Sequence, residues 1–452
     1  MQEKRLERMS SEKMMPLILS FSLPSIVSMS AMAMYNIVDT IFVGLLGTEA
    51  IAGLTLMIPL NMLLLAFSLL IGVGATSYIS RALGAKQYEQ AHHIFSSVTF
   101  AASLVGLILM GLALVFLRDI LEFIGRNSPA IKQAYDFGFV LSFSIPVVML
   151  TITLNQCARA EGNPNISMTS LLVGTAVNII LDPIFIFGLN WGIKGAALAT
   201  DIANVISLVI VLSYFIGPKS HLQFRLRLIK PTGLILKELG KAGLPSFTSH
   251  IAASFVIALT NSMLAGYGAF ALAIMGINNR LIMLFFMPMI GTGQGFMPIA
   301  GYNYGAKNFE RVKEAFWKAV ILVTGICTFG WILIQLFPEL FIRVFSTDPI
   351  VIEQGRSSLH IINLMLPLVG FQIIGATLYQ AMGEGLAGFI LSITRQVLVF
   401  LPLVIVFRAL FGLKGIFFAI PTADLLAGLI IFFWLRSTFK GQKLQPATVN
   451  VN

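Results

Sequence analysis

The tripeptide Gly84-Ala85-Lys86 recurs as Gly305-Ala306-Lys307, 221 residues further along the chain, and this repetition decides the fold. Two further pairs of motifs keep the same spacing to within one residue: Leu23-Pro24-Ser25 with Leu244-Pro245-Ser246, and Gly192-Ile193-Lys194-Gly195 with Gly412-Leu413-Lys414-Gly415. Between these motifs both copies are almost entirely apolar. The chain therefore consists of two similar halves, each rich in hydrophobic segments.

The composition is that of a membrane protein. Apolar residues make up 57% of the chain and charged residues 11%, and the mean hydropathy is +0.88, far from the values of soluble domains. Apolar runs of roughly 20 residues are long enough to cross a ~30 Å hydrocarbon core as helices. We predict an all-α polytopic membrane protein with twelve spans, at about 14–38, 52–80, 93–117, 134–158, 165–189, 195–216, 241–265, 270–300, 315–337, 356–381, 387–407 and 415–435.

The net charge of +10 reflects topology rather than a nucleic-acid partner. If both termini are cytoplasmic, most of the 30 Lys and Arg residues fall in cytoplasmic segments, and the largest group lies between the two halves. This distribution is the positive-inside bias, which sets the orientation of membrane helices. We expect a multi-pass protein of the bacterial inner membrane with both termini in the cytoplasm.

The predicted domains follow from the repeat. Residues 1–216 form an N-lobe of six spans, 217–237 a basic cytoplasmic linker, 238–436 a C-lobe of six spans, and 437–452 a polar tail. Because six is an even number, both lobes have the same orientation and are related by a pseudo-two-fold axis along the membrane normal. Transporters built from parallel repeats bind substrate near the bilayer midplane, between the halves.

Motifs for catalysis or nucleotide binding are absent from the sequence. It has no HExxH, no GxSxG and no Walker sequence, so we expect neither an enzyme nor a nucleotide-driven pump. No cofactor is expected, and any transport would be driven by an ion gradient of H⁺ or Na⁺.

Polar residues inside the predicted spans are the candidate site. Asp39 shares a helix face with Asn36, and Asp182 shares one with Asn178. A mid-membrane Asp costs ~2.5–3.5 kcal/mol to insert, so it is usually functional. Together with Asn155 and Thr200 these side chains form an oxygen-rich set for H⁺ or Na⁺ if their faces converge. The alternative is a structural Asp–Asn hydrogen bond between helices.

The two halves differ in their acids. In the repeat, Asp39 falls opposite Thr260, and Asp182 falls opposite Pro402. We therefore expect only the first half to carry buried acids and a cation site.

Several other residues carry weaker expectations. Pro24 and Pro183 each remove a helical hydrogen bond, which predicts either a hinge or a static kink. Arg280 is expected to face the cleft between the lobes and, like Asn36, to contact the substrate. Arg159 and Glu161, at the end of the fourth span, are expected to pair with each other or to extend toward the interface.

These features together resemble the MATE family of multidrug and toxic compound exporters, and especially its bacterial MepA-type branch. The resemblance covers about residues 14–436 and is carried by Pro24 to Asp39, Asn178-Ile179-Ile180-Leu181-Asp182-Pro183, and Gly192 to Ala197. It implies a secondary antiporter with its cation site at Asp39, Asn178, Asp182 and Thr200 and drug contacts at Tyr35 and Asn155.

The resemblance also implies the substrates, which are amphipathic and often cationic drugs, and a surrounding shell of membrane lipid. The sequence departs from the branch with an essential acid in the seventh span, where Ser254, Phe255 and Thr260 stand instead. Two other functions remain open: a flippase of lipid-linked precursors, and an intramembrane aspartyl protease that uses the two acids as its dyad.

Overall fold

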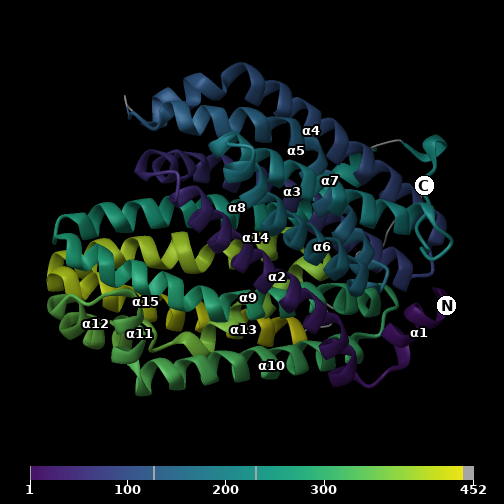
Figure 1. Ribbon diagram of the computed structural model, residues 1–452. Coiled ribbons are helices and arrows are strands. Elements are labelled where there is room, and N and C mark those ends of the chain that lie inside the picture. Colours follow the sequence, from purple (N-terminus) through teal and green to yellow (C-terminus); the bar gives the residue numbers. More distant parts are fainter. Residues whose placement is uncertain (1, 126–127, 230–231, 441–452) are drawn as a thin grey trace.

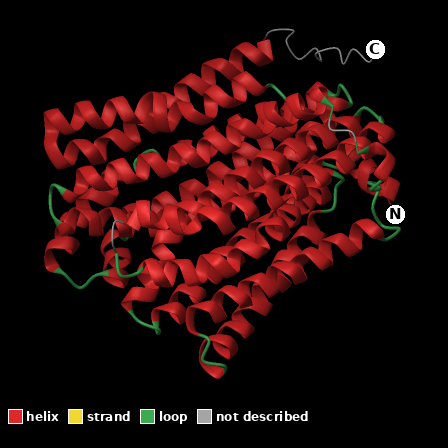
Figure 2. Ribbon diagram, turned by 90° about the horizontal axis from the view of Figure 1, so that it is seen from above, coloured by secondary structure: helices red, strands yellow, loops and turns green. Residues whose placement is uncertain are grey.

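The computed structural model describes residues 2–125, 128–229 and 232–440, and this part of the chain consists of helices joined by loops, with no strand (Figures 1 and 2). The first half contains α1 (Gln2–Ser11), α2 (Met14–Gly44), α3 (Thr48–Gly84), α4 (Tyr88–Gly125), α5 (Ile131–Ala160), α6 (Pro164–Pro183), the π-helical turn η1 (Ile184–Gly188) and α7 (Gly192–Ile216). After a linker with the short helix η2 (Leu226–Leu228), the second half contains α8 (Gly233–Ala265), α9 (Ala269–Gly305), α10 (Phe309–Leu336), α11 (Pro338–Phe345), α12 (Pro349–Ile362), α13 (Leu366–Met382), α14 (Gly385–Ile393), the π-helical η3 (Thr394–Phe400) and α15 (Leu401–Lys440).

The twelve predicted spans are confirmed, although two of them are irregular. In the described residues ten helical segments are long and apolar enough to span a membrane, and α12 with α13 forms an eleventh span that is bent by 45°. The segment Gly385–Phe439 counts as one of the ten but contains two spans, because Gly412 has φ 59° and ψ −134° and reverses the chain. Arg395 and Asp424 lie on either side of this reversal, and Arg395 Nε is 2.7 Å from Asp424 Oδ1.

Some boundaries differ from those that the hydropathy pattern suggests. Helix α8 begins at Gly233, inside the range expected for the linker. Helix α15 continues to Lys440, into the range expected for the polar tail, and residues 441–452 lie outside the described part. The extension of α15 is a mostly polar helical turn, which hydropathy does not detect, whereas the extension of α8 begins Gly-Leu-Ile-Leu and is apolar.

The two lobes pack against each other with pseudo-two-fold symmetry. Helix α2 packs on α9 and α3 packs on α8, while α3 and α9 meet each other. Gly84 lies against the carbonyl oxygen of Tyr302, and its repeat partner Gly305 lies against the carbonyl oxygen of Arg81. Tyr302 is itself 221 residues after Arg81, so the two contacts are related by the internal repeat. The repeated Gly-Ala-Lys motif thus marks the axis of the fold.

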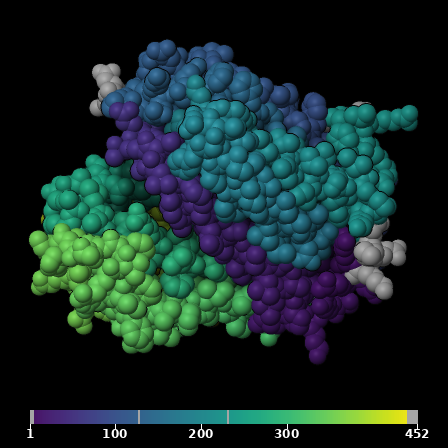
Figure 3. All heavy atoms as spheres, in the orientation of Figure 1, coloured from purple at the N-terminus to yellow at the C-terminus, as the bar shows by residue number. Residues whose placement is uncertain are grey.

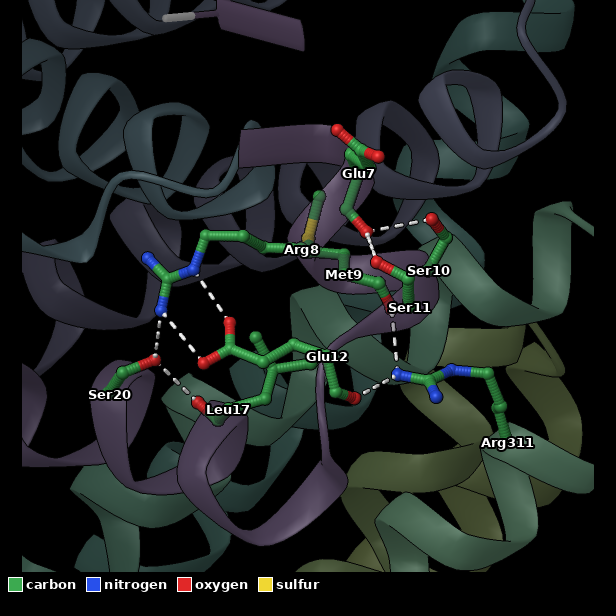
Figure 4. A network of polar contacts seen from close by, with 9 residues as sticks. All are labelled: Glu7, Arg8, Met9, Ser10, Ser11, Glu12, Leu17, Ser20 and Arg311. Carbon is green, nitrogen blue, oxygen red and sulfur yellow. Dashed lines mark hydrogen bonds and ion pairs between the residues drawn. The ribbon is translucent and has the colours of Figure 1, made fainter. Parts of the chain in front are cut away.

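The lobes are held together at the end of the molecule where α1 lies. Figure 4 shows the elbow between α1 and α2, where Arg8 and Glu12 form an ion pair at 2.6 Å. From the second half, Arg311 donates to the carbonyl oxygen of Glu12 at 2.8 Å, and Asn303 donates to that of Met9 at 3.0 Å. At the opposite end a groove separates the lobes, as the left side of Figure 3 shows.

Candidate functional site

The predicted polar residues converge inside the first lobe, where α2, α6 and α7 pack together. Asn178 and Asp182 lie one turn apart on α6, and Thr200 lies opposite them on α7. With its amide nitrogen turned toward the carboxylate, Asn178 donates to Asp182 Oδ2 at 2.9 Å, and its oxygen accepts from Thr200 Oγ1 at 3.2 Å. The spacing of four residues on α6 produces this geometry, because it places both side chains on one helix face.

Tyr35 of α2 completes this group of polar side chains. Its hydroxyl lies 3.3 Å from Thr200 Oγ1 and is within electrostatic reach of Asp39, Asp182 and Asp201. The charges of Asp39 and Asp182 also act on each other. We call Tyr35, Asp39, Asn178, Asp182 and Thr200 the N-lobe cluster.

The cluster is buried and has no fixed positive charge. Asp182 is fully buried and Asp39 is 9% exposed, and one carboxylate oxygen of Asp39 has no hydrogen-bond partner. In the part of the chain that the structure describes, neither residue forms an ion pair with Lys or Arg. A buried carboxylate without a partner is costly unless it is neutralised. The cluster is therefore suited to bind a proton or a small cation through carboxylate, amide and hydroxyl oxygens.

The remaining predicted contact residues lie in different surroundings. Asn155 of α5 is 1% exposed, and neither its side-chain nitrogen nor its oxygen has a hydrogen-bond partner; its role as a drug contact stays a prediction. Asn36 is exposed and donates back to the carbonyl oxygen of Met32. Arg280 is exposed, with its guanidinium 5.6 Å from the ring centre of Phe345. The structure does not bring Asn36 or Arg280 to the cluster, and their roles in binding remain predictions.

Asp201 is an acid near the cluster that helix periodicity did not place there. It follows Thr200 and lies about 100° further around α7, on the side of Ser144 of α5. Its charge nevertheless acts on Tyr35. In the sequence, the only indication that Asp201 lies near the cluster was its position next to Thr200.

The expectation that only the first half carries buried acids was wrong. Asp424 of α15 is 3% exposed and pairs with Arg395 of η3 at 2.7 Å. A cavity of about 40 Å³ adjoins this pair, with Asn363 in its wall at the bend between α12 and α13. The charge of Asp424 is thus compensated within the protein, unlike those of Asp39 and Asp182. The two lobes differ in the pairing of their acids rather than in the presence of acids.

The expectation that Arg159 and Glu161 pair or extend to the interface was also wrong. Arg159 is buried and donates to Ser167 Oγ at 2.6 Å. Glu161 is fully buried beyond the end of α5 and accepts hydrogen bonds from Ser220 Oγ and from the backbone N–H groups of His221 and Leu222. Burial raises the pKa of Glu161 to about 7, although these donors favour its charged form. This carboxyl fastens the linker to the first lobe.

The two prolines occupy positions where a helix could bend. Pro24 lies inside the continuous helix α2, and the backbone on either side of it contacts Gly291 and Gly295 of α9 closely. Pro183 directly follows Asp182 and is followed by the π-helical turn η1. Irregular π turns are frequent at functional sites. Pro183 thus connects Asp182 to backbone that differs from a regular α-helix, whereas Pro24 and Asp39 lie on one continuous helix.

Comparison with known proteins identifies relatives over nearly the whole chain. The MatE family profile matches residues 24–184 and again residues 245–406, one match in each half. The multidrug export protein MepA of Staphylococcus haemolyticus (strain JCSC1435) is 30% identical over 438 residues, which cover 97% of this chain and 96% of the relative. MepA of Staphylococcus aureus (strain MRSA252) is 32% identical over 442 residues, covering 96% and 97%.

Solved structures of the same architecture superimpose closely on this fold. An outward-facing multidrug resistance MATE transporter of the MOP superfamily has a TM-score of 0.91 and 26% identity, with 96% of this chain and 97% of that chain covered. A MATE structure in the bent conformation has a TM-score of 0.92 and 26% identity, with 98% and 99% covered.

Proposed function

This chain belongs to the MatE family and is a multidrug efflux transporter of the membrane, a secondary transporter rather than an enzyme, and from this premise we propose that it exports lipophilic cations in exchange for H⁺ or Na⁺. The observation that carries the proposal is the N-lobe cluster, whose buried carboxylates lack any fixed positive partner among the described residues. A transported proton or Na⁺ would supply the missing positive charge. For Na⁺ the oxygens of Asp39, Asn178, Asp182 and Thr200 would be the ligands.

Alternating access would couple the ion to the drug. Asp39 and Pro24 lie on the same helix, and α2 packs around Pro24 against α9 of the other lobe. A change of charge at Asp39 can therefore alter the bend at Pro24 and, through α9, the contact between the lobes. With both termini in the cytoplasm, the closed end of the molecule faces inward and the groove between the lobes faces outward.

The chemistry of the cluster favours cationic substrates. The three acids around Tyr35 attract positive charge, and the ring of Tyr35 can stack against a cation. The chain also has 36 Phe and 20 Met residues, and Met adapts readily to ligands of different shape. Few rigid polar groups fix a ligand here, so the selectivity among lipophilic cations should be broad.

The coupling ion can be identified by dye efflux from energised vesicles, with a pH jump and a Na⁺ jump applied separately. Efflux that responds to one jump and not to the other assigns the ion. Efflux that responds to neither jump, while ATP supports it, contradicts the proposal. Asp119→Asn is the matched control, because Asp119 is exposed and far from the cluster in sequence.

Competition between ion and drug can be measured by binding. A permanently charged quaternary ammonium dye should bind more tightly as the acids lose their protons, and this pH dependence should nearly vanish in Asp39→Asn. By linkage, the drug must lower the apparent proton affinity by the same factor as the proton lowers drug affinity. Equal dye affinity across the pH range in the wild type would rule out direct competition and leave coupling through the bend at Pro24.

A further inference from the structure

The linker between the lobes lies along the side of α4 rather than free in solution. The backbone N–H of Gln223 donates to His92 Nδ1 at 3.1 Å, and that of Arg225 donates to Ser96 Oγ at 3.0 Å. The Arg225 guanidinium also pairs with Glu89 at 2.9 Å. These contacts hold residues 223–225 along one face of α4 near its start, and the linker forms the teal loop at the right of Figure 1.

The same face of α4 becomes lipid-facing one turn further along. Glu89, His92 and Ser96 are spaced three and four residues apart, and this row continues through Phe100 and Leu107. Phe100 is 39% exposed and Leu107 is 52% exposed. Large apolar side chains exposed on a spanning helix face lipid, so the linker covers the cytoplasmic end of a lipid-facing row.

The depth of the linker follows from the same helix. Residues 90–117 contain no Asp, Glu, Lys or Arg, and Arg118 ends this run. Counted back from Arg118, eighteen residues at 1.5 Å each extend about 27 Å, close to the thickness of the hydrocarbon core, and reach Phe100. Ser96 lies only about 6 Å before Phe100 along the helix. The linker that binds Ser96 is therefore at the level of the lipid headgroups.

The linker has the side chains of an interfacial anchor. Phe224 and Leu226 are 48% and 76% exposed, and they alternate with Arg225 and Arg227. Arg225 is engaged by Glu89, whereas Arg227 is exposed and forms no ion pair within the described residues. These residues line a shallow hollow open to the outside, and the teal segment at the upper right of Figure 3 stands out from the surface. Exposed apolar side chains beside Arg are typical of membrane-surface segments.

We propose that residues Phe224–Leu228 bind the anionic headgroup layer of the surrounding bilayer, with Arg227 contacting phospholipid phosphate and with Phe224 and Leu226 inserted toward the acyl chains. The positive charge of the segment and its position at headgroup depth both favour anionic lipid as the ligand. The proposal does not depend on the coupling ion or on the drug. It assigns to the linker a second role, which is to fix the connection between the two lobes at the membrane surface.

The test uses the full-length protein with a single accessible thiol. Cys157 and Cys327 are both fully buried, so a Leu226→Cys variant can be labelled selectively with a polarity-sensitive fluorophore. The labelled protein is reconstituted in vesicles of phosphatidylcholine with or without phosphatidylglycerol, and brominated lipids of each headgroup serve as quenchers. The label should be quenched by both, and more strongly by brominated phosphatidylglycerol.

Arg227→Gln should reduce the preference for phosphatidylglycerol by about fivefold, the factor for one basic residue near an anionic surface. Arg356→Gln is the matched control, because it removes the same charge from an exposed site on α12, outside the linker. A water-like emission without lipid quenching would overturn the proposal. Self-quenching between labelled copies in place of lipid quenching would assign the surface to a second copy of the chain, and quenching without headgroup preference would refute the role of Arg227.

Discussion

Replacing Gly84 with alanine should force the lobes apart at the end of the molecule where α1 lies. A Cβ atom at Gly84 would lie 1.9 Å from the carbonyl oxygen of Tyr302, whereas real Cβ atoms essentially never come closer than 3.0 Å. The helices would have to separate by about 1 Å (3.0 − 1.9 = 1.1). The contacting atom belongs to the backbone, so no side-chain rotation can relieve the clash.

The expected size of the effect follows from overpacking. Forcing an extra carbon into a close contact typically costs about 1–3 kcal/mol. If the lobes separate in the alternative conformation, this cost falls on the closed state only and lowers its population relative to the other by roughly 5- to 150-fold. Gly325→Ala is the matched control, because nothing lies within 4 Å of a Cβ there. Alanine at that position should be neutral or slightly stabilising, since it favours helix.

The separation can be followed by electron–electron resonance between spin labels on the two lobes. Gln87→Cys and Glu310→Cys place labels on exposed positions near the closed end, and the native cysteines are buried. Gly84→Ala should add a population at longer distance and lower the rate of efflux. An unchanged distance distribution together with wild-type efflux would refute the assignment of Gly84 to the closed contact.

Three further predictions concern individual interactions. Burial raises the folded-state pKa of Glu161 from 4.5 to about 7, so the contribution of this carboxyl to stability is complete below pH 4.5 and is lost as the pH rises to about 7. Thermal unfolding in detergent should show a decline of up to roughly 3 kcal/mol in the free energy of unfolding over this range, and Glu161→Gln should remove the decline. A Glu161→Gln variant that keeps the same pH dependence would contradict this assignment. Arg395→Met leaves the buried Asp424 unpaired and should cost about 3–5 kcal/mol in the free energy of unfolding. The double change Arg395→Met and Asp424→Leu should recover most of this loss. A double variant as unstable as the single one would show that packing, not charge, is responsible. Tyr35→Phe removes only the hydrogen bond with Thr200, worth about 0.5–1.5 kcal/mol, so the affinity for a cationic dye should fall by no more than about tenfold. Complete loss of dye binding would mean that the hydroxyl contacts the drug or the ion itself.

The fold could be predicted from the sequence because its two main signals are strong. Apolar runs of membrane length gave the number of spans, and the 221-residue repeat gave the symmetry of the lobes. The elements that were misjudged are those that hydropathy does not measure. The break between α12 and α13, the start of α8 and the end of α15 depend on backbone geometry and on contacts outside the membrane.

The candidate site was predicted in part. Helix periodicity placed Asn178 with Asp182, and the family resemblance named Thr200 and Tyr35 for the same site. The structure shows the hydrogen bonds that link these four residues. Periodicity gives the face of a helix but not the neighbour that the face meets. Asp424 could not be recognised as buried without knowing that Arg395, 29 positions earlier, lies beside it after the chain reverses.

The distant partners of Glu161 illustrate the same limit. Its hydrogen-bond donors lie 59 to 61 residues away in the linker, and a local reading suggested the neighbouring Arg159 instead. A buried carboxylate is stabilised by whichever donors the tertiary fold provides, and sequence proximity does not identify them.

The most direct test of the account is gradient-driven dye efflux by Asp39→Asn and Asp182→Asn, measured beside Asp119→Asn at matched expression in the membrane. Either neutralisation in the N-lobe cluster should abolish coupled efflux while leaving membrane insertion intact, since removing a buried charge lowers the cost of insertion. Asp119→Asn should export at the wild-type rate, because its carboxylate is exposed. Wild-type efflux from both neutralised variants would contradict the claim that these two carboxylates couple the ion to the drug.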